Sequence, residues 1–314
     1  MPFEVKKIPF ELDSVDGMSV IRGFCWMPCG LEEPRGLVQL LHGMAEYIDR
    51  YDDFARFLAA QGFLVFGHDH IGHGQSQPDA DQRGKLPIEG ADIMVANAQL
   101  VQDSFAENFP YAPVFVFGHS MGSFIARALL CGNGEHLAGA IICGTGFVPV
   151  ATSRAGNLLA RTICRVKGED AYSPLLHSLA DGAYSKAIPD ARTPFDWLNT
   201  DDAQVDAYIE DSACGYGFSA GGYASLTALT AEVCSSRVAS GMPAYVPQLF
   251  IAGAQDPVGN NGVGVRQAAQ LSLDAGATDV QVKLYPDMRH EILNEPGHAQ
   301  VYADVLQWLT NVAS

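Results

Sequence analysis

The sequence predicts an α/β fold with a mostly parallel sheet of eight strands, helices on both faces and an inserted helical segment. Short apolar runs alternate with amphipathic helical patterns, and several runs are apolar at every position, which is typical of strands buried on both faces. The alternation stops between residues 146 and 246 and then resumes. This lapse indicates an insertion rather than a tandem domain.

The expected strands cover residues 3–12, 18–27, 36–41, 63–66, 114–117, 138–143, 248–253 and 280–285. The first two flank the Asp16-Gly17 turn and are expected to form a hairpin. Helices are expected at residues 51–61, 93–105, 124–130, 263–275 and 300–312, where apolar residues recur at helical spacing. We therefore assign residues 1–145 and 247–314 to a core domain and residues 146–246 to an inserted cap.

A nucleophile elbow is predicted in the middle of the core. Val114 to Phe117 is a buried strand pattern, Gly118-His119-Ser120-Met121-Gly122 follows directly, and a helical pattern begins shortly afterwards. A strand, a G-x-S-x-G turn and a helix in this order present a serine hydroxyl above the sheet, and the glycines avoid collisions with neighbouring backbone. Gly217-Phe218-Ser219-Ala220-Gly221 also matches, but no strand pattern precedes it, so we interpret it as a glycine-rich loop. Ser120 is the predicted nucleophile.

The partners of this serine are expected later in the chain. A serine hydroxyl needs a histidine to take its proton and a carboxylate to orient that histidine, and sites of this type have the order Ser, Asp or Glu, His. His290 follows the last expected strand across a short loop, whereas His298 lies farther on, beside the last helix. Asp256 follows the strand before, and its rival Asp287 lies only three residues ahead of His290. We predict a triad of Ser120, Asp256 and His290.

Two backbone amides are expected to stabilise the oxyanion that forms when the serine attacks. One belongs to Met121, the residue after the serine, and the other to Met44, in the loop after the strand at 36–41. The loss of one such donor typically costs about 2.7–4 kcal/mol of transition-state stabilisation. This chemistry requires no metal and no cofactor.

Several motifs resemble the α/β-hydrolase superfamily, and more closely its monoacylglycerol lipase and lysophospholipase-like branch. They are His42-Gly43-Met44-Ala45-Glu46-Tyr47 with Arg50-Tyr51, Asp69 to Ser76, the Gly118 to Gly122 elbow, Asp256-Pro257-Val258 and Arg289-His290-Glu291. The resemblance implies the α/β-hydrolase fold and a serine carboxylester hydrolase that works through an acyl-enzyme. Its expected substrates are monoacylglycerols or lysophospholipid-type monoesters.

The resemblance also implies a substrate-binding set. Glu46 and Arg50 match positions that lie near a polar subsite for the glycerol head group in such lipases, and we add His119 to this set. The alternative is that Glu46 and Arg50 form a structural pair that supports the oxyanion loop. This branch usually has a histidine at the position of Tyr47, which leaves the head group open. In the family, Asp69 to Ser76 is a structural loop, so we do not expect its histidines to bind a metal.

The charge and composition of the chain restrict its partners and location. The formal net charge is −17, which disfavours a nucleic-acid partner because phosphates are neutralised by Lys and Arg. The first ten residues contain no apolar signal-peptide region, and no uninterrupted apolar stretch is long enough to cross a bilayer. The seven cysteines include no C-x-x-C pair. We expect a cytoplasmic protein with a small acyl-ester or lipid substrate; the sequence gives no indication of its oligomeric state.

One stretch of the cap departs from the acidic character of the chain. Residues 153–167 carry Arg154, Arg161, Arg165 and Lys167 among apolar residues at helical spacing. One interpretation is an ordinary cap helix whose apolar side packs on the core. The other is a helix that rests on a lipid surface and gives the protein a peripheral membrane contact.

Two further functions remain open from the sequence. A peptidase that releases N-terminal residues would use the same machinery, with acidic cap residues such as Asp201-Asp202 or Glu210-Asp211 holding the amino group. A hydrolase-fold binding protein without catalysis is the alternative from another class, although the chain contains the three triad residue types in the required order. An aspartate would stand at the elbow in an epoxide hydrolase or dehalogenase, so these activities are disfavoured.

Overall fold

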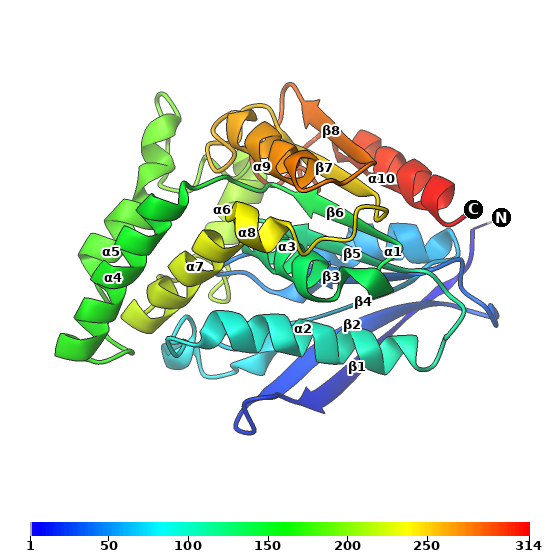
Figure 1. The fold of residues 1–314 in the computed structure, drawn as a ribbon, viewed down its shortest axis with the longest axis horizontal. Coiled ribbons are helices and arrows are strands. Elements are labelled where there is room, and N and C mark those ends of the chain that lie inside the picture. The colour runs from blue at the N-terminus through cyan, green and yellow to red at the C-terminus, as the bar shows by residue number, and fades with distance from the viewer. Residues whose placement is uncertain (1) are drawn as a thin grey trace.

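The computed structural model describes residues 2–314 and contains one sheet of eight strands with helices on both sides (Figure 1). The strands are β1 Val5–Asp13, β2 Val20–Pro28, β3 Leu37–Leu41, β4 Leu64–His68, β5 Val114–His119, β6 Gly139–Cys143, β7 Gln248–Gly253 and β8 Val280–Tyr285. Their order in the sheet is β1-β2-β4-β3-β5-β6-β7-β8. The β1–β2 and β2–β4 pairs are antiparallel and the other five pairs are parallel. The predicted fold class is confirmed.

Helices connect these strands and form the segment between β6 and β7. They are α1 Asp52–Ala60, α2 Gly90–Ala106, α3 Met121–Asn133, α4 Val150–Lys167, α5 Pro174–Ala180, α6 Asp202–Glu210, α7 Ala220–Val233, α8 Ser236–Ala239, α9 Val263–Asp274 and α10 His298–Val312. Short 3-10 helices span Ile48–Tyr51, Gly74–Ser76, Ala80–Gln82, Gly134–His136, Asp181–Ala183 and Ser185–Ala187. None of the helices within residues 2–314 is both long and apolar enough to cross a bilayer.

Alternating side chains of the strands fill two apolar layers. In β5, Val114 and Val116 pack in the layer formed with α2, α3 and α9, whereas Phe115 and Phe117 pack in the layer formed with α1 and α10. Successive side chains of a strand point to opposite faces of the sheet. Because both faces are covered, the central strands are apolar at every position.

The chain between β6 and β7 is helical. None of its described residues belongs to a strand of the sheet, and the one isolated bridge joins Tyr172 to Ser219. α7 contacts α2 and α3 on one side and α4 on the other. Apolar residues of α7, such as Ala224 and Leu229, are part of the same buried cluster as those of α3. α4 therefore forms an outer layer at one end of the molecule (Figure 1).

Four histidines are buried beside one another near the ends of β3 and β4. His42, His68, His70 and His73 are each at most 1% exposed, and the rings of His42 and His70 lie 4.2 Å apart. Burial lowers the pKa of His42 to about 3 and those of His68 and His73 to about 4, and it lowers the pKa of His70 well below its ordinary value. These side chains are therefore neutral in the folded protein. Across residues 2–314, no group of three or more His, Cys, Asp or Glu side chains is arranged to hold a metal ion.

Mild acid is expected to destabilise the fold through these histidines. They take up protons near pH 6.5 when the chain is unfolded but stay neutral in the folded protein down to about pH 4. The unfolded state then binds more protons, so stability falls as the pH drops below 6.5, by about 1.4 kcal/mol per pH unit for each additional proton. Burial raises the pKa of Asp69 to about 6, so the folded protein takes up one proton there in mild acid. This single proton opposes the loss of stability.

Urea unfolding at pH 6.5 and pH 5.0 measures the effect, because most carboxylates stay ionised over this interval. We expect a clearly lower midpoint at pH 5.0. Equal midpoints at the two pH values would contradict the prediction.

Candidate active site

Ser120 occupies a sharp turn between β5 and α3. Its backbone has φ 53° and ψ −118°, a conformation that non-glycine residues rarely adopt. The Ser120 amide donates to the carbonyl oxygen of Cys143 at 3.0 Å, and the amide and hydroxyl of Ser123 donate to the Ser120 carbonyl. These bonds anchor the strained residue to β6 on one side and to the first turn of α3 on the other.

The two glycines of the turn leave no room for a side chain. A Cβ on Gly118 would lie 2.2 Å from the carbonyl oxygen of Gly122, and one on Gly122 would lie 2.1 Å from that of Leu41. Both contacts are with backbone, which cannot rotate away as a side chain can. The close approach of α3 to β5 thus explains Gly118, and its close approach to the end of β3 explains Gly122.

Asp256 and His290 form a buried hydrogen-bonded pair. Asp256 lies in the loop after β7 and His290 in the loop after β8, and the His290 Nδ1 donates to Asp256 Oδ2 at 2.8 Å. The other carboxylate oxygen of Asp256 accepts from the amide of Val258 at 2.9 Å. Asp256 is fully buried and His290 is 2% exposed. This hydrogen bond leaves Nε2 as the imidazole nitrogen that can accept a proton.

Ser120 and His290 line one cavity, which contains about 850 Å³ of empty space including its opening to solvent. Most of the wall is apolar and comes from both the sheet and the segment between β6 and β7. Glu46 and His119 also line it, whereas Arg50 does not. The structure therefore brings together the predicted serine and histidine, with Asp256 behind the histidine.

Met44 and Met121, the two predicted oxyanion donors, also lie at this cavity. Both residues line its wall, and within residues 2–314 neither amide donates a hydrogen bond to another group of the protein. Met121 is the first residue of α3, where amides lack a partner inside the helix and the helix dipole favours negative charge. Such amides can stabilise an oxyanion that forms on an atom attacked by Ser120.

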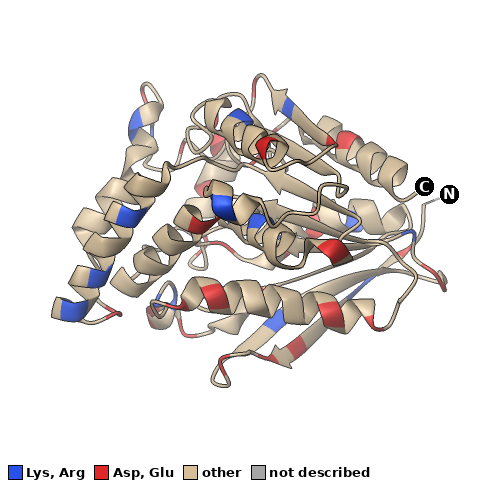
Figure 2. Ribbon diagram, viewed as in Figure 1, with Lys and Arg blue, Asp and Glu red and all other residues tan. Residues whose placement is uncertain are grey.

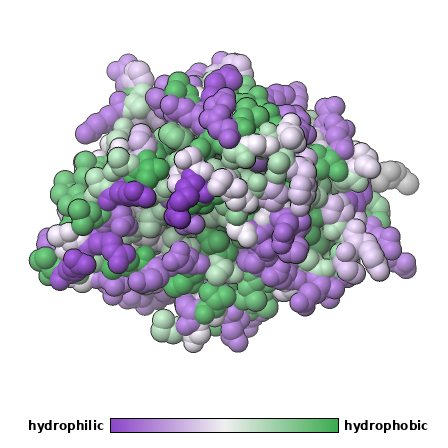
Figure 3. All heavy atoms as spheres, in the orientation of Figure 1, coloured by the Kyte–Doolittle hydropathy of each residue, from purple (hydrophilic) through white to green (hydrophobic). Residues whose placement is uncertain are grey.

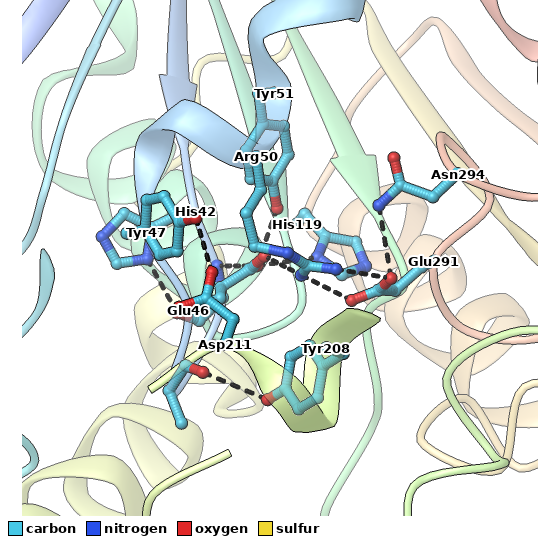
Figure 4. A network of polar contacts seen from close by, with 12 residues as sticks. His42, Glu46, Tyr47, Arg50, Tyr51, His119, Tyr208, Asp211, Glu291 and Asn294 are labelled. Carbon is cyan, nitrogen blue, oxygen red and sulfur yellow. Dashed lines mark hydrogen bonds and ion pairs between the residues drawn. The ribbon is translucent and has the colours of Figure 1, made fainter. Parts of the chain in front are cut away.

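Glu46 and Arg50 belong to a buried ionic network (Figure 4). Arg50 donates to Glu46 Oε2 at 2.7 Å and to both carboxylate oxygens of Glu291 at 2.6 and 2.9 Å. Glu46 Oε1 accepts from the amide of Gly43 at 2.6 Å and from the Tyr51 hydroxyl at 2.8 Å. Arg50 thus holds two carboxylates together, and one of them fixes the loop that carries Met44.

His119, the residue before the serine, reaches two catalytic loops at once. Its Nδ1 lies 3.3 Å from Glu46 Oε1, and its Nε2 lies 3.2 Å from the carbonyl oxygen of His290. Burial alone would lower the pKa of His119, but the hydrogen bond and charge of Glu46, with the charge of Glu291, raise it above its ordinary value.

The helical segment between β6 and β7 is bonded directly to the loop of His290. The Glu291 amide donates to the Leu198 carbonyl at 2.8 Å, and the Arg289 side chain donates to the carbonyl oxygens of Asp196 and Asn199. The ring of Trp197 lies 5.1 Å from that of His290. These contacts hold the indole of Trp197 next to the imidazole of His290, with the two rings tilted by 46°.

The competing residues from the sequence lie elsewhere. Ser219 is the N-cap of α7, and its side chain accepts from the Gly222 amide. Asp287 is exposed, and His298 is the first residue of α10, with its ring bonded to the Glu295 carbonyl. The ion pair of Glu291 with Arg50 was not predicted from the sequence, although Glu291 belongs to the motif Arg289-His290-Glu291.

The chain was compared with known families and proteins. A family model described as serine aminopeptidase, S33, matches residues 32–297. The chain belongs to this family. Proteins similar to it along most of its length include a monoacylglycerol lipase of Mycolicibacterium smegmatis and a monoglyceride lipase of Homo sapiens. The first is 28% identical over 89% of both chains, and the second is 26% identical over 97% of this chain and 92% of its own.

Solved structures agree with this family. A thermostable carboxyl esterase from Bacillus coagulans, solved in complex with glycerol, has a TM-score of 0.91 and is 27% identical over 99% of this chain and 100% of its own. This S33 protein is thus a serine hydrolase with the α/β-hydrolase fold, similar to monoacylglycerol lipases and of the carboxylic ester hydrolase class. The resemblance inferred from the motifs is confirmed.

A Gly122→Ala variant is expected to lose activity and at least about 3 kcal/mol of stability, because its Cβ would collide with the Leu41 carbonyl. Gly132→Ala, in the same helix, is the matched control. No atom lies within 4 Å of a Cβ there, and we expect it to keep activity and gain about 0.4–1 kcal/mol. Urea unfolding and ester hydrolysis compare the two variants. Equal stability of the two variants would contradict this explanation of the elbow.

Proposed function

We propose that the protein hydrolyses the ester bond of monoacylglycerols through an acyl-enzyme on Ser120. The observation that carries the proposal is that Ser120 and His290 line the same apolar cavity, with Asp256 hydrogen-bonded behind the histidine. Two proteins that are similar to this one along most of the chain are named monoacylglycerol lipase and monoglyceride lipase, and these names support this substrate class.

The proposed mechanism follows from the positions of these groups. His290 Nε2 takes the proton of Ser120 as its oxygen attacks the ester carbonyl, and Asp256 stabilises the imidazolium. The amides of Met44 and Met121 hold the oxyanion. His290 then gives the proton to the leaving glycerol oxygen, which leaves an acyl group on Ser120. A water molecule, activated by the same histidine, releases the fatty acid and restores the serine.

The two ends of the substrate are expected to meet different walls. Phe124, Leu226 and Val258 provide apolar surface for an acyl chain. Glu46 and His119 provide the polar wall, and we propose that the glycerol hydroxyl groups lie against them. Arg50 acts on this wall through Glu46 and Glu291. We further propose that residues 146–246 form a cap over the acyl chain.

The acidic residues of the helical segment give little support to a peptidase. Among the described residues, the carboxylates at the cavity are Glu46 and Glu291, and both form ion pairs with Arg50. Asp211 accepts from the Tyr47 hydroxyl at 2.6 Å, and Asp201 caps α6 through the Ala203 amide. The cavity therefore offers no unpaired carboxylate, among the described residues, to bind the amino terminus of a peptide substrate.

The decisive experiment is hydrolysis of a 1-monoacylglycerol chain-length series, beside short p-nitrophenyl esters and an aminoacyl amide. We expect turnover of monoacylglycerols that Ser120→Ala reduces by at least about 10³-fold. Activity on short esters alone would contradict the lipid substrate, and preference for the amide would indicate a peptidase. If neither hydrolysis nor labelling of Ser120 by a fluorophosphonate probe were observed, the protein would be a non-catalytic binder.

We also propose that α4 rests on a lipid surface and brings the cavity to its substrate. Its buried residues are small, namely Ser153, Ala160 and Cys164, whereas Leu158 and Val166 are 66% and 78% exposed. Arg154, Arg161, Arg165 and Lys167 are exposed on the same helix (Figure 2). Apolar and hydrophilic side chains alternate over this end of the molecule (Figure 3). Exposed apolar residues beside basic ones are typical of helices that lie in the plane of a membrane surface.

Charge reversal on α4 tests the contact. Arg161→Glu/Arg165→Glu is expected to weaken binding to phosphatidylcholine vesicles containing phosphatidylglycerol by at least about tenfold, because each basic residue near an anionic surface contributes about 1 kcal/mol. Arg237→Glu/Arg266→Glu, in the exposed parts of α8 and α9, is the control with the same change in net charge. Binding that is equal in the two double variants would rule out the proposed surface.

A further inference from the structure

His119 is the histidine of the buried network around Arg50, and an imidazole can be neutral or carry a positive charge. His119 lies at the end of β5 and contacts Glu46 of the loop after β3 (Figure 4). It also contacts the backbone carbonyl of His290 in the loop after β8. The loop after β6 approaches it through Gly144, which has no ionisable side chain. The charged and titratable groups that face it are Glu46, Tyr51, His290, Glu291 and its register partner Cys143, with Arg50 beyond the carboxylates. Burial raises the pKa of the Cys143 thiol well above its ordinary value, so this group stays neutral.

Both ring nitrogens of His119 face hydrogen-bond acceptors. One is a carboxylate oxygen of Glu46 and the other is the backbone carbonyl of His290. A neutral imidazole carries one N–H, so one of its nitrogens would present a lone pair to an oxygen. An imidazolium donates at both positions. The geometry therefore matches the doubly protonated ring.

The charges of the network lead to the same state. Arg50 carries one positive charge, and Glu46 and Glu291 carry one negative charge each, so a neutral His119 would leave one buried negative charge without compensation. An uncompensated charge is costly when it is buried. Protonation of His119 makes the four side chains neutral together.

We propose that His119 is held as an imidazolium and acts as a positioning residue that joins the oxyanion loop to the loop of the catalytic histidine. On one side it donates to Glu46, which accepts from the Gly43 amide next to Met44. On the other it donates to the carbonyl of His290 itself. The negative charge of Glu46 and Glu291 outweighs the effect of burial and raises the pKa of His119, in agreement with this state.

This inference rests on the proposed roles of Ser120 and His290, but its first test does not require turnover. Nitrogen-15 NMR of histidine-labelled wild-type enzyme reports the protonation of each ring, and the resonances missing from His119→Gln identify His119. We expect two protonated ring nitrogens at a pH where histidine in a model peptide is mostly neutral. In Glu46→Gln, which removes one negative charge, we expect His119 to lose one of these protons. A neutral His119 in the wild-type enzyme would overturn the proposal.

Kinetics then test the positioning role. A glutamine at residue 119 can donate from one end of its amide only, so it cannot serve both acceptors. For a p-nitrophenyl ester, we expect kcat of His119→Gln to fall at least about tenfold and KM to change by less than about twofold. The reason is that the variant misplaces an oxyanion donor and the catalytic base, and these groups stabilise the transition state rather than the bound ester. His136→Gln, in the exposed turn after α3, is the control for the same exchange.

These outcomes separate this inference from the proposed function. Labelling of wild-type Ser120 by a fluorophosphonate probe and hydrolysis by the wild-type enzyme test the proposed function alone. An unchanged kcat in His119→Gln, in an enzyme that Ser120→Ala inactivates, would overturn the positioning role and leave the triad intact. The positioning role is supported if kcat falls in His119→Gln and the His119 ring is neutral in Glu46→Gln.

Discussion

The left-handed backbone at Ser120 is the constraint on which the site depends. This single conformation turns the chain from β5 into α3, directs the serine side chain into the cavity and leaves the Met121 amide at the start of a helix. Such a conformation costs free energy and persists only where the surroundings determine it. Here the surroundings are the backbone groups packed closely against Gly118 and Gly122. They fix the turn, because α3 cannot move away without separating from β3.

The fold and the positions of Ser120, Asp256 and His290 in it were predictable because their signals are local. Strands buried on both faces are apolar at every position, and the strand–turn–helix around Ser120 occupies one short stretch of sequence. Asp256 and His290 come just after β7 and β8, and the ends of parallel strands meet at one edge of the sheet. Helix boundaries were less exact: α3 begins at Met121 rather than Phe124, because the second glycine of the elbow is already helical.

The ionic network could not be predicted in the same way. Arg50 and Glu291 are far apart in the sequence and no periodic pattern relates them, so only the folded chain reveals their bidentate contact. The sequence offered two interpretations of Glu46 and Arg50, a head-group subsite or a structural pair. The structure shows the ion pair and bonds Glu46 to the Gly43 amide, and Glu46 also lines the cavity. The head-group subsite stays a proposal.

The hydrogen bonds between the helical segment and the loop of His290 limit how the cavity can admit a bulky molecule. Leu198 accepts from the Glu291 amide, and Arg289 binds two carbonyl groups on either side of Trp197. An outward swing of the whole segment as a rigid lid would therefore pull on the loop that carries His290. A movement that keeps the His290 ring in place has to leave residues 195–200 behind. Entry to the cavity thus cannot depend on the segment opening as one rigid body.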